Sequence, residues 1–354
     1  MPKPGVQWDA VHVSINRDAI TCSSDGSIVI ASGRSNSYLF SSLDFGATWT
    51  QLTSAGRRNW RPAAVSDDGS KIVAGTAGNY LYVSSDAGAT WSVKLNSLST
   101  KNWDDIASSS DLRYAAVIAK STNSSTQGYL YTSSDSGATW TEQTSLADKD
   151  LQDVACSSDG SVMYVSERGS ATTPSYIYKS IDYGTTWTPL PSSLQTDSTG
   201  WGTIACSDDG TTIMGIASTL WISSDGGTTW SEKTNVPSAF FGYSSLKCSS
   251  DSQVIIMTPF SSDYIVTSHN QGTTWTKQLG SGQRSWTKVA ISDDGTKMYA
   301  VPSSGFVYAS SGIYDVPVKI WDGSQWVKRP LRQRSGGQWV EGSVYSRWNG
   351  TQWQ

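Results

Sequence analysis

An eight-residue motif, Ser-x-Asp-x-Gly-x-Thr-Trp, occurs six times along this chain of 354 residues. Its third positions lie 42 to 49 residues apart and are Asp44, Asp86, Asp135, Asp182, Asp225 and Asn270. A repeat of this length is longer than one hairpin and shorter than a domain, so no single copy can bury a core alone. The chain therefore folds as a series of similar units that pack on their neighbours.

A second repeat, an aspartate in a turn that follows an apolar strand, runs in phase with the first. It occurs seven times, at intervals of 42 to 50 residues, at Asp25, Asp68, Asp111, Asp159, Asp209, Asp251 and Asp294. Apolar and polar residues alternate between clusters of Gly, Asn, Asp and Ser, which predicts four short antiparallel strands in each unit, for example 153–156 and 161–166. The predicted fold class is all-β, a seven-bladed β-propeller over residues 1–316.

The seventh unit has no Thr-Trp strand after 306–312, but the N-terminus offers one. Residues 5–11, Gly-Val-Gln-Trp-Asp-Ala-Val, align with the end of the motif, and Trp8 lies 17 residues before Asp25. We therefore predict that the N-terminal strand completes the last blade and leaves no free sheet edge. Removal of residues 1–12 is expected to destabilise the whole ring.

Composition agrees with a water-soluble all-β protein, at 37% hydrophobic and 16% charged residues. No apolar run reaches the roughly 18 residues of a membrane span, and the first residues lack the apolar stretch of a secretory signal. Four cysteines stand three residues before the turn aspartate of their own units: Cys22, Cys156, Cys206 and Cys248. Because they occupy equivalent positions on different sheets, we interpret them as small buried residues between blades rather than as disulfides or a metal site.

The eight-residue motif is similar to the Asp boxes of sialidases, two-propeller xyloglucanases, sortilin-like receptors and photosystem II assembly factors. In those families the box is structural and lies away from the active or binding face. The residues themselves favour the same interpretation, because the aspartate can accept hydrogen bonds from turn amides and the glycine can adopt a positive φ. We therefore assign the six third positions to turn formation and name no catalytic residue, cofactor or metal.

A glycoside hydrolase is an alternative, since some Asp-box families have that activity. A sialidase-like site would need three arginines around a substrate carboxylate, and the arginines of this chain show no such pattern. Glycoside hydrolysis requires two carboxyl groups that face one bond. The best-placed candidates are Asp104, Asp105 and Asp153, near the start of the innermost strands, but we favour solvated loop carboxylates with no catalytic role.

An aromatic series precedes the turn aspartates by eight residues and is the strongest hint of a ligand site. It consists of Trp60, Trp103, Trp201, Tyr243 and Trp286, with Leu151 and Arg17 in the two remaining units. Placed around the channel mouth, these rings would form a ligand-binding face for sugars or other amphipathic molecules. The alternative is that each ring packs against the neighbouring blade. The leucine at this position in one unit slightly favours that alternative.

Residues 317–354 form a second segment with a shorter repeat and the opposite charge. Trp-Asp-Gly-Ser-Gln-Trp and Trp-Asn-Gly-Thr-Gln-Trp are hairpin signals, and the segment carries a net charge of +4 against −8 for residues 1–316. A basic, Trp-rich segment of this length is unlikely to fold into its own core, so we expect it to dock on a partner. The expected contact residues are Trp321, Trp326, Arg329, Arg332, Arg334, Trp339, Trp348 and Trp353.

The short repeat resembles the Trp-[Asp/Asn]-Gly-x-x-Trp hairpins that often close bacteriophage virion and tail proteins. This resemblance implies a non-enzymatic structural or adhesion protein of a phage particle, located in the virion, or in the cytoplasm before assembly. The tail would attach it to the assembly, and the propeller would present a face to a cell-surface glycan or receptor. Nucleic acid is an unlikely partner because the acidic propeller opposes it. A glycoside hydrolase and a photosystem II assembly-factor-like scaffold remain the alternatives.

Overall fold

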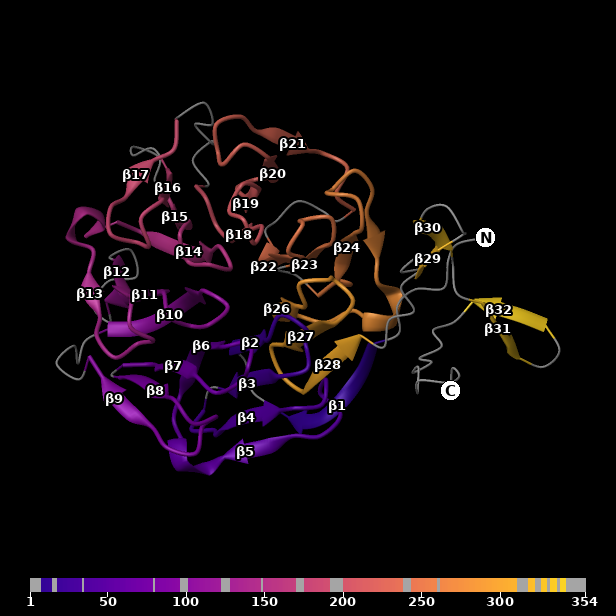
Figure 1. Ribbon diagram of the computed structural model, residues 1–354. Coiled ribbons are helices and arrows are strands. Elements are labelled where there is room, and N and C mark those ends of the chain that lie inside the picture. The colour runs from indigo at the N-terminus through magenta and orange to yellow at the C-terminus, as the bar shows by residue number, and fades with distance from the viewer. Residues whose placement is uncertain are drawn as a thin grey trace.

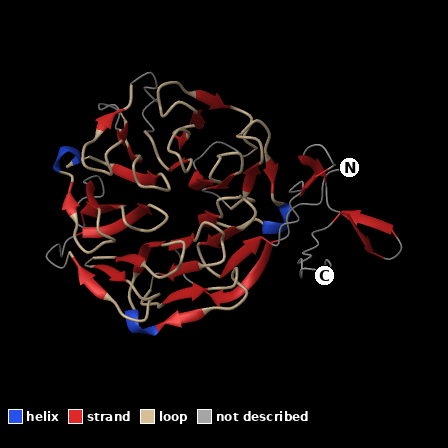
Figure 2. Ribbon diagram, viewed as in Figure 1, coloured by secondary structure: helices blue, strands red, loops and turns tan. Residues whose placement is uncertain are grey.

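A computed structural model shows a ring of seven four-stranded antiparallel sheets around a central axis, which confirms the predicted fold class (Figure 1). It describes residues 8–14, 18–33, 35–78, 80–95, 101–121, 128–147, 149–169, 175–191, 200–237, 243–259, 262–310, 318–321, 326–329, 332–335 and 338–341. Strands account for nearly all of the regular structure, and the described helices are three short 3-10 turns at the rim (Figure 2). No described helix is long and apolar enough to cross a membrane.

Each blade runs from an inner strand beside the axis to an outer strand at the rim. Blades 1 and 2 contain β2 (Asp18–Cys22), β3 (Val29–Gly33), β4 (Leu39–Ser42), β5 (Thr50–Leu52), β6 (Trp60–Val65), β7 (Ile72–Thr76), β8 (Leu81–Ser84) and β9 (Ser92–Lys94). Blades 3 and 4 contain β10 (Lys101–Ser108), β11 (Ala115–Ser121), β12 (Gly128–Ser133), β13 (Thr141–Glu142), β14 (Leu151–Cys156), β15 (Met163–Glu167), β16 (Ile177–Ser180) and β17 (Thr188–Pro189). Blades 5 and 6 contain β18 (Ile204–Cys206), β19 (Ile213–Ile216), β20 (Leu220–Ser223), β21 (Ser231–Lys233), β22 (Tyr243–Cys248), β23 (Ile255–Pro259), β24 (Val266–Ser268) and β25 (Thr276–Lys277). The 3-10 turns are η1 (Thr53–Ala55), η2 (Thr144–Leu146) and η3 (Leu279–Ser281).

Blade 7 combines the two ends of the propeller, as the sequence predicts. Its strands are β26 (Trp286–Ile291), β27 (Met298–Pro302), β28 (Phe306–Ser310) and, outermost, β1 (Trp8–Ser14). Strand β1 pairs with β28 from Trp8 opposite Ser310 to Ser14 opposite Phe306. Figure 1 shows the indigo β1 beside the orange β28. This pairing closes the ring and covers an edge that would otherwise be free.

The core consists of seven apolar clusters, one between each pair of neighbouring blades. In the first, Ile30 and Leu39 of blade 1 pack with Trp60 and Ile72 of blade 2. Trp103, Leu151, Trp201 and Trp286 occupy the corresponding places in four other clusters. The residue eight positions before the turn aspartate therefore anchors its blade on the preceding one, which matches the packing alternative.

The eight-residue motif forms the turn between the third and fourth strands of a blade. In the first copy, the Asp44 carboxylate accepts hydrogen bonds from the Thr48 amide (2.8 Å) and hydroxyl (2.6 Å), while the Trp49 indole donates to the Gly46 carbonyl (2.9 Å). Gly46 adopts a φ of 84°, which favours glycine at this place. The other five copies repeat these contacts, with the Asn270 amide donating to Thr274 in the sixth. The motif side chains thus stabilise turns.

The turns between first and second strands form a continuous belt of hydrogen bonds around one end of the channel. The residue before each turn aspartate donates its amide to the carbonyl of its counterpart in the next blade in six places, at 2.7 to 3.0 Å. At the seventh place the Ser24 amide donates instead to the Asp67 carboxylate at 2.9 Å. Every blade boundary is therefore crossed by a polar contact as well as by an apolar cluster.

The C-terminal segment contains two antiparallel strand pairs, which confirms two of the predicted hairpins. Strands β29 (Val318–Trp321) and β30 (Trp326–Arg329) pair with Trp321 opposite Trp326, as expected for Trp residues that flank a turn. Strands β31 (Arg332–Ser335) and β32 (Gln338–Glu341) pair with Arg334 opposite Trp339. The predicted third hairpin, with Trp348 and Trp353, lies outside the described residues.

Candidate functional site

The axial channel contains two adjoining cavities, which we call the upper and lower chambers. The upper chamber has a volume of about 160 Å³ and is lined by charged residues from the beginnings of the inner strands, including Arg61, Asp104, Asp105 and Lys288. The lower chamber has a volume of about 220 Å³ and opens beside the hydrogen-bonded belt. Both chambers share part of their wall, including Lys247. The channel therefore offers a polar cavity at either end.

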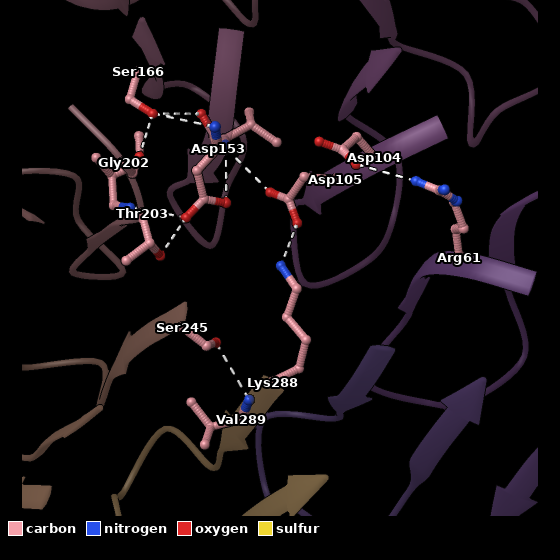
Figure 3. A network of polar contacts seen from close by, with 12 residues as sticks. Arg61, Asp104, Asp105, Asp153, Ser166, Gly202, Thr203, Ser245, Lys288 and Val289 are labelled. Atoms are coloured by element: carbon pink, nitrogen blue, oxygen red, sulfur yellow. Dashed lines mark hydrogen bonds and ion pairs between the residues drawn. The ribbon is translucent and has the colours of Figure 1, made fainter. Parts of the chain in front are cut away.

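Two buried carboxyl groups, Asp105 in the wall of the upper chamber and Asp153 on the next inner strand, connect three neighbouring blades (Figure 3). Asp105 on β10 accepts a hydrogen bond from the Val154 amide of β14 at 3.1 Å. Asp153 on β14 accepts hydrogen bonds from the Ile204 amide (2.8 Å) and the Thr203 hydroxyl (2.5 Å) of blade 5. Each carboxyl group thus satisfies a backbone donor at the start of the next inner strand.

Irregular pairing in β14 explains why the Val154 amide takes an acceptor from another blade. The register of β14 with β15 shifts between Leu151 and Val154. A β-bulge leaves a backbone amide outside the ladder of its own sheet. The side chain of the preceding blade then provides the acceptor.

Lys288 reaches across the channel from blade 7 to blade 3. Its ammonium lies 3.5 Å from an oxygen of Asp105, 183 residues away in the sequence. Figure 3 shows its extended side chain pointing from β26 toward this carboxyl group. Asp104 points elsewhere and forms ion pairs of 3.3 Å with Arg61 and with Lys120. The upper chamber therefore holds two separate charge networks.

Burial and the close contact of the two carboxyl groups separate their pKa values. Burial raises the pKa of Asp105 to about 7, and the negative charge of Asp153 adds to the rise although Lys288 opposes it. Burial also acts to raise the pKa of Asp153, but the hydrogen bond with Asp105 and the charges of Lys288 and Lys247 outweigh it, so that the pKa is lowered. The pKa of Lys288 is raised by the Asp105 and Asp153 carboxylates despite its burial. One proton is therefore shared in a pair that holds a single negative charge.

This arrangement predicts that the protein loses stability as the pH rises from about 4 to about 7. The pKa of Asp105 is about 7 in the folded protein and near its ordinary value of 3.8 in the unfolded chain, so the folded state binds the extra proton in that range. The raised pKa of Asp208, about 6, acts in the same direction. In urea unfolding, the free energy of unfolding of Asp105→Asn should fall less between pH 4.5 and pH 7.5 than that of the wild type. An equal fall in both proteins would contradict the assignment.

The structure corrects the expectation that the candidate carboxylates are solvated loop residues. Asp105 and Asp153 lie on inner strands and are only 9% and 6% exposed. Their hydrogen bonds to the next blade explain this burial, because an unpaired buried carboxylate would be costly. Asp104 also lies on β10, but its side chain is 30% exposed and lines the upper chamber.

The structure also corrects the expected ring of exposed aromatic residues. Trp60 and Trp103 are 0% exposed, Trp286 is 1% and Trp201 is 3%, so no ring face is open to a ligand. The side chain of Tyr243 lies outside the described residues. The reason is geometric, since these four rings pack in the apolar clusters between blades rather than at the channel mouth. We do not assign a ligand site to these residues.

The four cysteines line the lower chamber as free thiols. They are half-buried in the channel wall, rather than fully enclosed between blades. Burial raises the pKa of all four, to about 12 for Cys248, so the thiols stay protonated at neutral pH. Among the described residues, no group of three or more His, Cys, Asp or Glu side chains is arranged to hold a metal ion.

Three residues of the upper chamber, Lys247, Lys288 and Arg61, carry charge into the channel but are absent from the sequence-based candidates. The sequence does contain a signal for Lys247. Four residues before the turn aspartate, six of the seven units have Ala or Thr, and the remaining unit has Lys247. Lys288 likewise occupies the position of Asp105 and Asp153 in its own unit. Comparing equivalent positions across units would identify both lysines.

No protein-family model and no curated protein sequence matches the chain. Several solved structures share its fold. A YCF48 structure bound to a D1 peptide has a TM-score of 0.61 at 15% identity and covers 86% of this chain and 97% of that one. An ancestral GH74 enzyme has a TM-score of 0.63 at 12% identity, with coverage of 96% and 49%. An oligogalacturonate lyase in complex with manganese has a TM-score of 0.65 at 13% identity, with coverage of 88% and 95%.

These similarities establish the class of the protein as a seven-bladed β-propeller. At 12 to 15% identity they concern the fold alone, and they include enzymes as well as a peptide-bound protein. The Asp-box and phage-tail assignments remain resemblances in short sequence motifs.

Proposed function

We propose that this chain is a non-enzymatic binding protein whose propeller is a rigid scaffold. The observation that carries the proposal is the use of Asp105 and Asp153 as links between blades. Glycosidases hold two carboxyl groups about 5 to 9.5 Å apart with the scissile bond between them. Here the two groups are buried and accept hydrogen bonds from backbone amides of the next blade, so neither is free to face a scissile bond.

A protein partner fits the propeller better than a glycan. The aromatic faces that would stack on sugar rings are enclosed in the inter-blade clusters. The YCF48 propeller of similar fold is bound to a D1 peptide, which supports a peptide or protein ligand without identifying it. A scaffold of this kind corresponds to the assembly-factor-like alternative from the sequence.

The C-terminal hairpins are the proposed attachment to a larger assembly. They carry Trp321, Trp326 and Trp339 on strands that follow the completed ring, and the segment is basic whereas the propeller is acidic. Aromatic and arginine residues are enriched at the centres of protein interfaces. A virion is the proposed assembly, and its support is the resemblance of the Trp-x-Gly-x-x-Trp repeat to phage tail proteins.

Removal of residues 317–354 should abolish capture of the partner while leaving the propeller stable. Strand β28 ends at Ser310 and pairs with β1, so the ring is complete before the first hairpin begins. We expect the melting temperature to change by less than about 2 °C, since the deleted part contributes no ring strand. Calorimetry measures the melting temperature of the deletion variant. Affinity capture from purified virions measures its binding to the proposed assembly.

A full-length variant with Trp321→Ala and Trp326→Ala provides the matched control for the deletion. It should lose most of the captured material as well, because hot-spot aromatics each contribute about 2 kcal/mol or more. Undiminished capture by residues 1–316 would show that the propeller, and not the hairpins, makes the attachment.

A further inference from the structure

Lys247 is an unpaired positive charge at the junction of the two chambers. The equivalent residues of the other six blades are small: Thr21, Ala64, Ala107, Ala155, Ala205 and Ala290. Lys247 lines both cavities, and no hydrogen bond or ion pair of its ammonium is found among the described residues. A cation in a confined cavity loses hydration, and a nearby anion would offset that loss.

Arg61 brings a second unsatisfied donor to the upper chamber. One terminal nitrogen of its guanidinium group contacts Asp104 at 3.3 Å, but its Nε is buried and has no acceptor. The Asp104 carboxylate is already shared with Lys120 at 3.3 Å. Buried N–H groups are nearly always paired, so this donor indicates an acceptor that the protein itself does not provide.

Positive charges outnumber negative charges in the wall of the upper chamber. Its lining contains three cationic side chains, Arg61, Lys247 and Lys288, and two carboxyl groups, Asp104 and Asp105. Arg61 pairs with Asp104 and Lys288 with Asp105, whereas the carboxyl groups of Asp67, Asp208 and Asp293 line only the lower chamber. Lys247 is then the excess positive charge of the upper chamber. Lys247 lines this chamber together with Arg61 and Lys288.

We propose that the upper chamber binds a small oxyanion, a phosphate or a small carboxylate, between the Lys247 ammonium and the Arg61 guanidinium group. Both side chains are the usual partners of carboxylate and phosphate oxygens. The cavity of about 160 Å³ greatly exceeds the roughly 10–15 Å³ that one water molecule needs, yet it excludes a polymer chain. The inference is independent of the protein partner and of the C-terminal hairpins.

The test is calorimetric titration of the full-length protein with sodium phosphate and with sodium acetate at constant ionic strength set by sodium chloride. The wild type should bind at least one of the two oxyanions saturably, with one site per chain. Lys247→Ala introduces the residue that five other blades carry, so its melting temperature without oxyanion should equal that of the wild type within about 2 °C. Its affinity should fall at least tenfold.

Two further variants make the result specific to the chamber. Arg61→Gln should also weaken binding at least tenfold, and it introduces the residue that blade 4 carries as Gln152. Lys94→Ala, on the outer strand β9, should leave the affinity unchanged. Equal affinity of the wild type and Lys247→Ala would overturn the proposal, as would the absence of heat with both oxyanions.

Discussion

Removal of residues 1–14 is expected to destabilise all seven blades together, because β1 is the strand that closes the ring. Trp8 is 5% exposed and packs 6.4 Å from the Trp286 ring, centroid to centroid. Loss of a buried Trp side chain alone costs about 3 to 5 kcal/mol. The deletion also exposes the edge of β28, so we expect aggregation in addition to a melting temperature lowered by roughly 10 °C or more.

Addition of the missing strand in trans distinguishes ring closure from a general loss of contacts. A synthetic peptide of residues 1–14 should raise the melting temperature of the truncated chain in a concentration-dependent way, because it binds only the folded form. Trp8→Ala in the full chain should give an intermediate loss, measured by urea unfolding. A truncated chain as stable as the wild type would show that the other strands hold the ring without β1.

Replacement of Asp153 by alanine should cost about 3 to 5 kcal/mol of unfolding free energy, since it leaves buried donors without an acceptor. The donors are the Ile204 amide and the Thr203 hydroxyl, at 2.8 and 2.5 Å from the carboxylate. Loss of the negative charge also removes a partner of Lys288. Urea denaturation at pH 7 measures the effect.

The other blades provide matched controls for this substitution. In blade 6 the equivalent residue is Ser245, whose hydroxyl accepts a hydrogen bond from the Val289 amide at 3.3 Å. Asp153→Ser should therefore retain more stability than Asp153→Ala. Asp104→Asn, at a half-exposed ion pair, should cost less than about 1 kcal/mol. A loss below about 0.5 kcal/mol for Asp153→Ala, the usual range for a surface substitution, would refute the link between blades.

The repeats predict the ring well because each copy encodes its own turns. Asp44 and its counterparts contact residues at most four positions away, so the motif specifies its geometry locally. Closure by β1 is also predictable, since residues 5–11 match the strand that the seventh unit lacks. These features depend on spacing, which the sequence displays directly.

The channel is less predictable because its contacts join residues far apart in the chain. The pair Lys288–Asp105 spans 183 residues, and neither residue is marked by a motif. The bulge between Trp103 and Asp105 also interrupts the alternation of inward and outward residues.

Release of reducing ends from a panel of polysaccharides, including xyloglucan and polygalacturonate, tests the central claim most directly. The assay uses the folded full-length protein from pH 4.5 to 7.5, with and without Mn²⁺, beside Asp104→Asn. Asp104 is the informative position because it lines the upper chamber and its ion-pair partners are the side chains of Arg61 and Lys120 rather than buried backbone donors. A binding scaffold should release no more sugar than heat-denatured protein. Turnover by the wild type that disappears in a folded Asp104→Asn variant would contradict the account and assign the channel to catalysis.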